Sequence, residues 1–499
     1  MNKSKTSTYV VEIGLKTDEF QNEILESRFN IVHHITNVLV KNSIKCIHQL
    51  ERDSKYRTIL TKKGKLSRQD KIDLTNIRMK YGLSEYQFHS YVAVQQSMYK
   101  KHINSMVAQK IATKVWKSVE KYLFSNGNSI HFKKFDQIIS YEGKTNTTGI
   151  VYKNGYILNN GLKLKLSYRK SDELVTKALS QIEEGTTRVK YCRIVRKFIK
   201  NKYQYFVQLI LEGNPIKEKN IPILVDKTVG IDIGPSSIAV VSDEKIIFKE
   251  LASNIKKTDN EIARLNRKLD RQRRSNNLQN YNEDGTIKRN SKYFKKTWHY
   301  SKNMIKTKNQ LRYLYQKRSN QLKLSHTLLA NEILKLGSNI IIEDMQWSAL
   351  ARKAKKTEKS EKTGKFKKKK RFGKSITNHA PSKLIEIMNT KLKYIDKEII
   401  KVDCFKTAAT KFNHNTGELM DISLKDRYVV IDGHTIQRDI HSAFNLQNVI
   451  ITKTDIAYSY DLQTMNDKFT SFIKKHDELI NNLKKQKQLG TKFPNCMSI

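Results

Sequence analysis

The chain has 499 residues, of which 38% are hydrophobic, so it is long enough to bury a sizeable core and to fold as more than one domain. Its 95 lysines and arginines outnumber 48 aspartates and glutamates, which gives a formal net charge of +47 at pH 7. Because this excess recurs in nearly every segment, the sequence predicts a polyanionic partner. Charge alone leaves both a catalytic role and a purely packaging role open, since a ribosomal or chromosomal coat protein would show the same excess.

The cysteine pattern and the N-terminus exclude several other classes of protein. The four cysteines form no C-x-x-C pair, which excludes a disulfide framework and a cysteine zinc site as expectations. The N-terminus lacks the apolar core of a signal peptide, and no stretch reaches the roughly 18 apolar residues that a membrane span requires. We therefore expect a soluble protein in a reducing cytoplasm, with no membrane partner.

The N-terminal half changes pattern twice. Residues 8 to 14 alternate as a short strand, and apolar residues then recur at helical spacing from Ile31 to Ile44. A second helical block is expected over about residues 84 to 124, with Ser84 as its N-cap. From residue 129 to about 212, short alternating runs separated by Gly and Asn indicate a β-rich, barrel-like unit. Tyrosines lie between cations in this unit, a mixture that suits backbone contact with base stacking but also an ordinary half-buried sheet. They are Tyr152, Tyr156, Tyr168, Tyr191, Tyr203 and Tyr205.

The C-terminal half begins with a new pattern after a proline-containing segment near residue 220, where we expect a domain boundary. Residues 229 to 251 read as three strands, in the opening order of a ribonuclease-H-like sheet. Two long basic helices are expected next, with Gly337 as the C-terminal cap of the second. Residues 351 to 374 form the densest charge run, whose default interpretation is a solvated loop. The tail after about residue 452 contains an amphipathic helix to which the sequence assigns no role.

Two acidic residues interrupt or end apolar strands in this half. Asp232, in VGIDIG, breaks a central strand, where an unpaired buried charge would be costly. A metal ion removes that cost, and Gly234 admits close approach of a backbone or phosphate, so a ligand role is preferred to a turn acid. Glu343 ends a second interior strand, NIIIE. Asp344 is its rival, but successive strand residues face opposite ways, so only one of the two reaches the site, and Glu343 is preferred.

A third acid, Asp439, lies at or near the start of a helix with one apolar face. Taken alone, it is explained equally well as an N-cap. Arg438 and Asn445 flank the same element and could contact phosphate or support ligands, whereas His441 is expected to pack or to face solvent. Carboxylates that converge from separate elements are what two Mg²⁺ ions about 4 Å apart require for phosphodiester hydrolysis.

These motifs together resemble a known family. The GIDIG, IIIED and QRDIHSAFNL blocks, in this order and with a basic helical pair between the first two, resemble the three motifs of a RuvC nuclease domain. Over most of residues 8 to 450, the chain resembles the TnpB family of transposon-encoded RNA-guided nucleases, which are related to compact type V CRISPR effectors. The resemblance implies an α/β multidomain fold, with a ribonuclease-H-like RuvC domain and a β-barrel wedge domain that contains an inserted helical recognition lobe.

The resemblance also implies domain limits. The wedge barrel would begin in residues 1–18 and resume in 126–222, on either side of a recognition lobe in 19–125. The RuvC-like domain with its basic helical insertion would occupy 223–402. A degenerate target-nucleic-acid-binding subdomain without zinc cysteines would follow in 403–435, then the third RuvC motif in 436–452 and a C-terminal tail in 453–499.

By resemblance, the activity would be that of a Mg²⁺-dependent endodeoxyribonuclease directed by a noncoding guide RNA and a short motif beside the target. The catalytic, metal-binding role is carried onto Asp232, Glu343 and Asp439, which would hold two Mg²⁺ ions, with Mn²⁺ able to substitute. The partners would be the guide RNA and double-stranded DNA with a displaced strand, bound by a monomer in the bacterial cytoplasm and at the nucleoid when DNA is engaged. The expected nucleic-acid contacts are Arg438, Asn445, Lys367, Lys368, Lys369, Lys370 and Arg371.

One departure from the family and three alternatives remain at this stage. Relatives place a four-cysteine zinc ribbon between the second and third motifs, where this chain offers only Cys404. Asp403, His414 and His434 could join it, but their spacing matches no common site, so zinc is not expected. The alternatives are an RNA-guided DNA-binding repressor, a compact type V CRISPR effector and an unguided structure-selective nuclease. A repressor would be signalled by a lost acid, and none is lost, whereas a junction resolvase needs neither the helical lobe nor the barrel.

Overall fold

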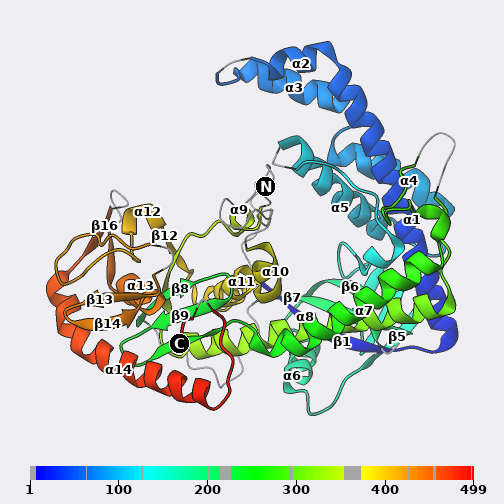
Figure 1. The fold of residues 1–499 in the computed structure, drawn as a ribbon. Helices are drawn as coiled ribbons and strands as arrows, with labels where there is room; N and C mark the ends of the chain where they lie inside the picture. Colours follow the sequence, from blue (N-terminus) through cyan, green and yellow to red (C-terminus); the bar gives the residue numbers. More distant parts are fainter. Residues whose placement is uncertain are drawn as a thin grey trace. The chain divides into compact units, whose positions relative to one another are not determined.

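The computed structural model describes residues 7–62, 64–124, 127–199, 202–213, 226–290, 296–352, 372–423, 426–452, 457–495 and 497–499. The chain divides into two compact units, Met1–Glu218 and Lys219–Ile499, coloured from blue to green and from green to red in Figure 1. The run Lys367 to Arg371, expected to contact nucleic acid, lies outside the described residues. In the described part of the chain, no helix is both long enough and apolar enough to cross a membrane.

The first unit contains a curled, half-barrel sheet of seven antiparallel strands in the order β2-β6-β7-β1-β5-β4-β3. The strands are β1 (Thr8–Lys16), β2 (Ser140–Glu142), β3 (Ile150–Lys153), β4 (Tyr156–Asn159), β5 (Leu162–Ser167), β6 (Val189–Ile199) and β7 (Lys202–Glu212). Every second residue of β1 is buried, as the alternation in the sequence predicts. Strand β1 therefore lies in the middle of a sheet whose other strands come more than a hundred residues later.

Helices fill the insertion between β1 and β2. They are α1 (Glu19–Arg52), α2 (Ser54–Leu60), α3 (Arg68–Lys80), α4 (Glu85–Met98) and α5 (Ser105–Phe124), and α6 (Glu173–Glu183) follows later in the unit. The predicted N-cap is confirmed, because the Ser84 side chain accepts a hydrogen bond from the Gln87 amide. The helical block expected over about residues 84 to 124 is confirmed and consists of two helices, α4 and α5. The chain turns between them after Met98, and Ile103 is buried in this turn.

One hydrophobic core joins these helices to the sheet. Phe29 of α1 packs edge-on against Tyr141 of β2, with ring centroids 5.0 Å apart. The neighbouring Arg28 is buried, and its two terminal nitrogens donate to the carbonyl oxygens of Asn159 and Asn160, both at 2.6 Å. The guanidinium therefore satisfies strand-end carbonyls that burial would otherwise leave without partners.

The second unit is built on a five-stranded sheet in the order β10-β9-β8-β11-β12. The strands are β8 (Thr228–Ile233), β9 (Ser237–Val241), β10 (Ile246–Glu250), β11 (Asn339–Glu343) and β12 (Ile400–Val402). Strands β8, β11 and β12 are parallel, and β9 is antiparallel to both of its neighbours. The three strands expected over residues 229 to 251 are thus confirmed.

Helices lie on both faces of this sheet. They are α7 (Lys256–Ser275), α8 (Lys302–Leu334), α9 (Trp347–Leu350), α10 (Gly373–His379), α11 (Pro381–Leu392), α12 (Cys404–Thr407), α13 (Arg438–Asn448) and α14 (Leu462–Gln488). Two short hairpins complete the unit, β13 (Tyr428–Ile431) with β14 (His434–Gln437) and β15 (Val449–Thr452) with β16 (Ala457–Tyr460). Odd-numbered residues of β8 pack against α8 and α11, and its even-numbered residues face α13.

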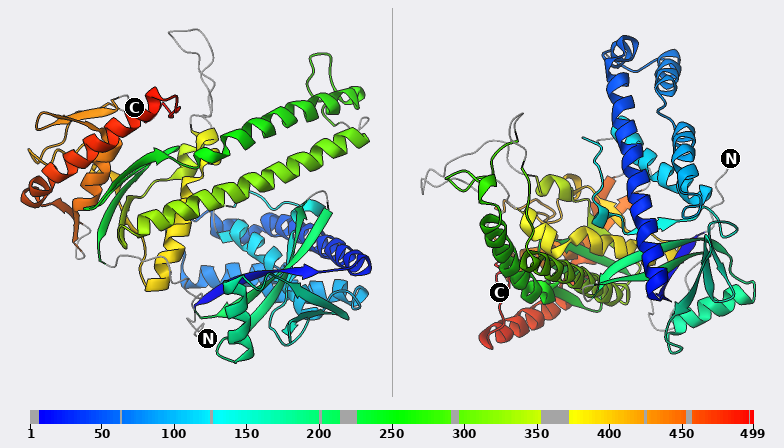
Figure 2. Two further views of the ribbon diagram at one scale, coloured as in Figure 1. Left: turned by 90° about the horizontal axis from the view of Figure 1, so that it is seen from below. Right: turned by 90° about the vertical axis from the view of Figure 1, so that its right-hand side faces the viewer.

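The expected basic helical pair is α7 and α8, which lie side by side as the two green helices in Figure 2. Arg318 of α8 donates a hydrogen bond to Asp259 of α7. Gly337 does not cap α8, which ends at Leu334 with Lys335 as the capping residue. A Cβ at Gly337 would lie 2.4 Å from the carbonyl oxygen of Lys227. The glycine is therefore required by a close approach of two backbones rather than by a helix end.

Candidate active site

Asp232 and Glu343 leave neighbouring parallel strands on the same face of the five-stranded sheet. Ile341 of β11 pairs with Gly230 of β8, so the same register two residues later places Glu343 beside Asp232. Both carboxylates line one small cavity together with Met345. They lie at the carboxyl ends of parallel strands, the edge where open α/β sheets bind their ligands.

Gly230 lets helix α13 lie directly on strand β8. A Cβ at this position would lie 2.1 Å from the carbonyl oxygen of Ala443 and 2.2 Å from the amide nitrogen of Gln447, both on α13. Asp232 is two residues farther along the same strand face, and Asp439 is one helical turn before Ala443. The close crossing at a glycine therefore brings the carboxylates of two sequence-distant elements toward each other.

The charges of the three carboxylates interact. Burial raises the pKa of Asp232 well above its ordinary range, and the negative charges of Asp439 and Glu343 raise it further, against the opposing charge of Arg438 and a hydrogen bond from Ser442. Burial also raises the pKa of Glu343 to about 7. The protein's own cations therefore do not fully neutralise the carboxylates at this edge. A bound cation would stabilise their charged forms.

Asp439 is not the helix cap that the sequence left open. Helix α13 begins at Arg438, and its N-cap is Gln437, whose side-chain oxygen accepts a hydrogen bond from the Ile440 amide at 2.9 Å. Arg438 instead pairs with Asp439, with 3.1 Å between Nη2 and Oδ1 and side-chain exposures of 11% and 16%. Arg438 also donates to the carbonyl oxygen of Asp426 at 2.9 Å. In this structure the Arg438 guanidinium is thus engaged by Asp439 and by the Asp426 carbonyl oxygen, and it does not extend into solvent.

Asn445 corrects an expectation from the sequence. Its side chain is fully buried and donates to the carbonyl oxygens of Ala409 and Phe412, both at 2.8 Å, so it ties α13 to the preceding loop and does not face a nucleic acid. His441 is also fully buried, and desolvation, with a smaller effect of His414, lowers its pKa to about 3. His441 therefore stays neutral and packs, as predicted.

Two of the four residues weighed for zinc make other contacts. Asp403 caps α12, where its carboxylate accepts hydrogen bonds from the Phe405 and Lys406 amides. His414 is buried against Phe469, with ring centroids 4.4 Å apart.

The three carboxylates suit a divalent cation by the chemistry of their oxygen atoms, which are the donors that Mg²⁺ and Mn²⁺ prefer. Among the described residues, no three His, Cys, Asp or Glu side chains are gathered into a coordination cluster. Asp439 is engaged by Arg438, so its carboxylate must turn from that arginine to join the other two. The raised pKa values and the like charges at one edge are what a bound divalent cation would offset.

A groove of about 680 Å³ is lined by Asp344 and Met345, which follow Glu343 in the chain, and sequence reasoning did not find it. Asp344 is exposed at its edge and pairs with Lys401 at 2.8 Å, so the neighbour of Glu343 has a surface partner. Phe405 lies in the same lining with 91% of its surface exposed, next to Lys406. An aromatic ring between cations suits single-stranded nucleic acid. Residue type carries no signal for this groove, because an exposed phenylalanine cannot be distinguished from a buried one in the sequence.

No protein-family model and no curated protein matches the sequence. Among solved structures, the chain is similar to a chain of a cryo-EM structure of a Cas12f1–sgRNA–target DNA complex, at 13% identity and a TM-score of 0.46, over 89% of this chain and 99% of that one. It is also similar to a chain of a cryo-EM structure of a CRISPR-Cas12f ternary complex, at 14% identity and a TM-score of 0.27, over 89% and 87% of the two chains. At such values, function has to be inferred from the residues of the site itself.

Proposed function

We propose that this protein is an RNA-guided DNA endonuclease with one hydrolytic site formed by Asp232, Glu343 and Asp439. The observation that carries the proposal is the approach of these carboxylates, from β8, β11 and α13, to one sheet edge, where burial first and then the charges of Asp439 and Glu343 raise the pKa of Asp232. A sheet with an antiparallel second strand followed by parallel strands supports the ribonuclease-H-like, RuvC-type interpretation of this unit.

The three carboxylates would hold two Mg²⁺ ions, which when bound activate water and offset the charge that develops at the scissile phosphate. Asp232 would act from the centre of the sheet, with its carboxylate oriented by Ser442. Glu343 would contribute from the neighbouring strand end. Arg438 would hold Asp439 in the metal-free protein and so limit repulsion among the acids before a cation binds.

The groove lined by Asp344 and Met345 would receive the DNA strand. Lys401 and Lys406 line it with Phe405, so the phosphates of a single strand could lie along the lysines while one base stacks on the phenyl ring. Such contacts recognise backbone and ring faces and read little sequence. Sequence choice would therefore come from pairing with a guide RNA, which agrees with a net charge of +47.

The first unit supports the guided form of the proposal over an unguided nuclease. It has its own core and its own sheet, and it contributes none of the three carboxylates. A structure-selective nuclease of this type would not need such a unit, whereas a guide-bound enzyme requires surface for RNA and for the heteroduplex. A transposon-encoded nuclease of the TnpB type and a compact type V effector are two forms of this proposal that differ in the source of the guide.

The test is to express the chain together with its native flanking DNA, purify it, treat the complex with nuclease and sequence the protected RNA. One defined RNA that runs into the flanking sequence is the expected result. A plasmid that matches this RNA should then be cut by the wild type in Mg²⁺ and not by Asp232→Ala, which should retain the RNA. Absent or heterogeneous RNA would contradict guidance and favour the unguided nuclease.

A further inference from the structure

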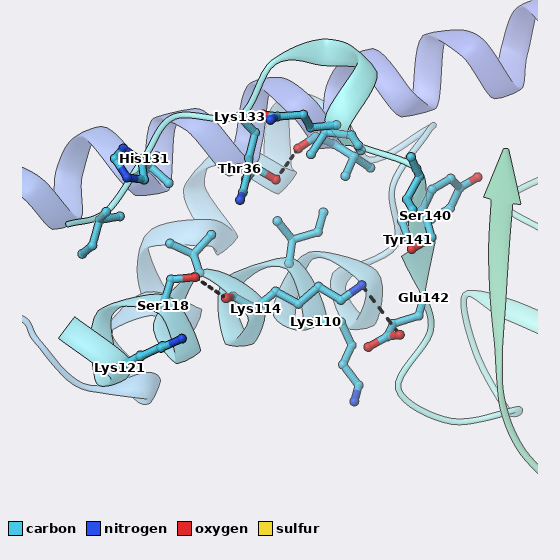
Figure 3. A pocket seen from close by; sticks show the side chains of 18 of the residues that line it. Thr36, Lys110, Lys114, Ser118, Lys121, His131, Lys133, Ser140, Tyr141 and Glu142 are labelled. Atoms are coloured by element: carbon cyan, nitrogen blue, oxygen red, sulfur yellow. Dashed lines mark hydrogen bonds and ion pairs between the residues drawn. The ribbon is translucent and has the colours of Figure 1, made fainter. Parts of the chain in front are cut away.

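A pocket of about 660 Å³ opens in the first unit, separate from the three carboxylates. It lies between α1, α5, residues 127 to 133 and β2, as Figure 3 shows. Its volume falls within the range of sites that enclose a small molecule, which is roughly 300–1,000 Å³. Nothing in the proposed cleavage chemistry uses this pocket.

The pocket carries an excess of positive charge. Lys110, Lys114, Lys121 and Lys133 line it, and among its lining residues Glu142 is the one carboxylate. The first three lie on α5 at spacings of four and seven residues, which places them on one face of the helix. Figure 3 shows Lys133 on the wall that faces α5. Cations four residues apart on a helix repel each other, so this arrangement costs free energy in the absence of an anion.

Glu142 does not neutralise the lysines. Its carboxylate is held by Nε of Arg193 at 2.7 Å and also lies 3.7 Å from Nζ of Lys114. One carboxylate is therefore shared by two cations, while Lys121 and Lys133 have no acid beside them in the pocket lining. Burial lowers the pKa of Lys114, and the nearby charges of Arg193 and Lys110 act in the same direction against the attraction of Glu142. An anion in the pocket would offset the repulsion among these cations.

The remaining wall of the pocket is aliphatic, and a simple inorganic anion would make no apolar contact with it. It is formed by side chains of α1, α5 and the segment before β2, namely Val32, Val40, Ile111, Val115, Ile130 and Ile138. Five of these six side chains are buried, with exposed fractions of 3–9%, so the wall presents apolar atoms at the bottom of the pocket rather than a broad exposed surface. A phosphate or sulfate ion would pair with the lysines without contacting these atoms, whereas a nucleotide could place its base against them and its phosphate at the lysines.

We propose that this pocket binds one nucleotide, with the phosphate on the α5 lysines and Lys133 and the base on the aliphatic wall. The nucleotide can come from two sources with the same chemistry, a free mononucleotide or an unpaired nucleotide that is turned out of an RNA or DNA strand. The proposal goes beyond the nuclease function, because it assigns a second binding site that lies within the other unit.

The experiment uses the full chain, freed of copurified nucleic acid, and two charge or shape variants with a matched control. Lys121→Gln removes one pocket cation, and Ser118→Trp fills the pocket from an exposed position on α5 without changing charge. Lys117→Gln removes an exposed cation from the same helix that does not line the pocket. Circular dichroism would establish that each variant is folded. Isothermal titration calorimetry would then measure binding of nucleoside 5′-monophosphates, ribose 5-phosphate and twelve-nucleotide single strands with and without one abasic position.

The expected result is a loss of affinity of about tenfold for Lys121→Gln, as for one charge-assisted hydrogen bond, and loss of detectable binding for Ser118→Trp, with Lys117→Gln close to the wild type. These effects with mononucleotides would identify a free nucleotide as ligand. No effect with mononucleotides, together with loss in both pocket variants of the part of the single-strand affinity that the abasic position removes, would identify an extruded nucleotide, because the groove at Phe405 still binds the rest of the strand. Equal effects of all three variants, or ribose 5-phosphate bound as tightly as the nucleotides, would overturn the proposal. Asp232→Ala should bind every probe like the wild type, so a failure of the cleavage site is distinguishable from a failure of this pocket.

Discussion

Gly230→Ala tests whether the close crossing of β8 and α13 creates the candidate site. The added Cβ would lie 2.1 Å from the Ala443 carbonyl oxygen and 2.2 Å from the Gln447 amide, whereas ordinary contacts begin at 3.4 Å. The helix would therefore have to withdraw by about 1.3 Å, the difference between 3.4 and 2.1 Å. Both clashing groups are backbone, so no side-chain rotation can relieve the overlap. Because overpacking typically costs about 1–3 kcal/mol, we expect the upper end, about 3 kcal/mol.

Two readouts follow from that displacement. In differential scanning calorimetry, about 3 kcal/mol should lower the melting temperature of the second unit by roughly 6–12 °C. Because Asp439 moves with α13, cleavage should fall by about 100-fold, as expected when a catalytic group is displaced by about 1 Å. Gly234→Ala is the matched stability control, since the nearest atom to its Cβ would be a side-chain oxygen at 3.3 Å. A Gly230→Ala protein that melts and cuts like the wild type would refute the reasoning.

Three further predictions concern single residues. Burial raises the pKa of Glu343 from 4.5 to about 7. The folded protein thus binds this proton more tightly than the unfolded chain does. As the pH rises from 4.5 to 7 in EDTA, the free energy of unfolding of the wild type should therefore fall relative to that of Glu343→Gln, by at most about 3 kcal/mol in urea titrations. A difference that instead increases with pH would contradict the raised pKa. Phe405→Ala should weaken single-stranded DNA binding by about tenfold with the melting temperature unchanged, because its ring is exposed; unchanged affinity would remove Phe405 from the strand path. Arg28→Met should destabilise the first unit by about 2–4 kcal/mol, since the carbonyls of Asn159 and Asn160 lose their donors; calorimetry that shows no change would exclude this role.

Sequence periodicity was sufficient for the features that depend on neighbours along one strand. Alternation across a strand separates Glu343 from Asp344, and the structure places the first beside Asp232 in the strand register and the second at the surface with Lys401. The cap at Ser84 follows from local chemistry in the same way.

Features that depend on packing between distant elements could not be predicted from the sequence. The turn after Met98 exists because Ile103 is buried there, and helical spacing does not report such burial. Gly337 resembles a helix cap in sequence but serves a close approach of backbones. Asn445 is a polar residue within the third motif, and only the packing of α13 shows that its side-chain amide donates to the buried carbonyl oxygens of Ala409 and Phe412.

The most direct test of the central claim compares two adjacent acids. Wild type, Glu343→Gln and Asp344→Asn, each loaded with the copurified RNA, would be assayed for cleavage of the matching plasmid in Mg²⁺. We predict a loss of about a thousandfold or more for Glu343→Gln, since a metal-binding acid supports several kcal/mol of transition-state stabilisation, and little change for Asp344→Asn, whose ion pair with Lys401 is exposed. Equal rates for the two variants, or a loss confined to Asp344→Asn, would contradict the assignment of the site.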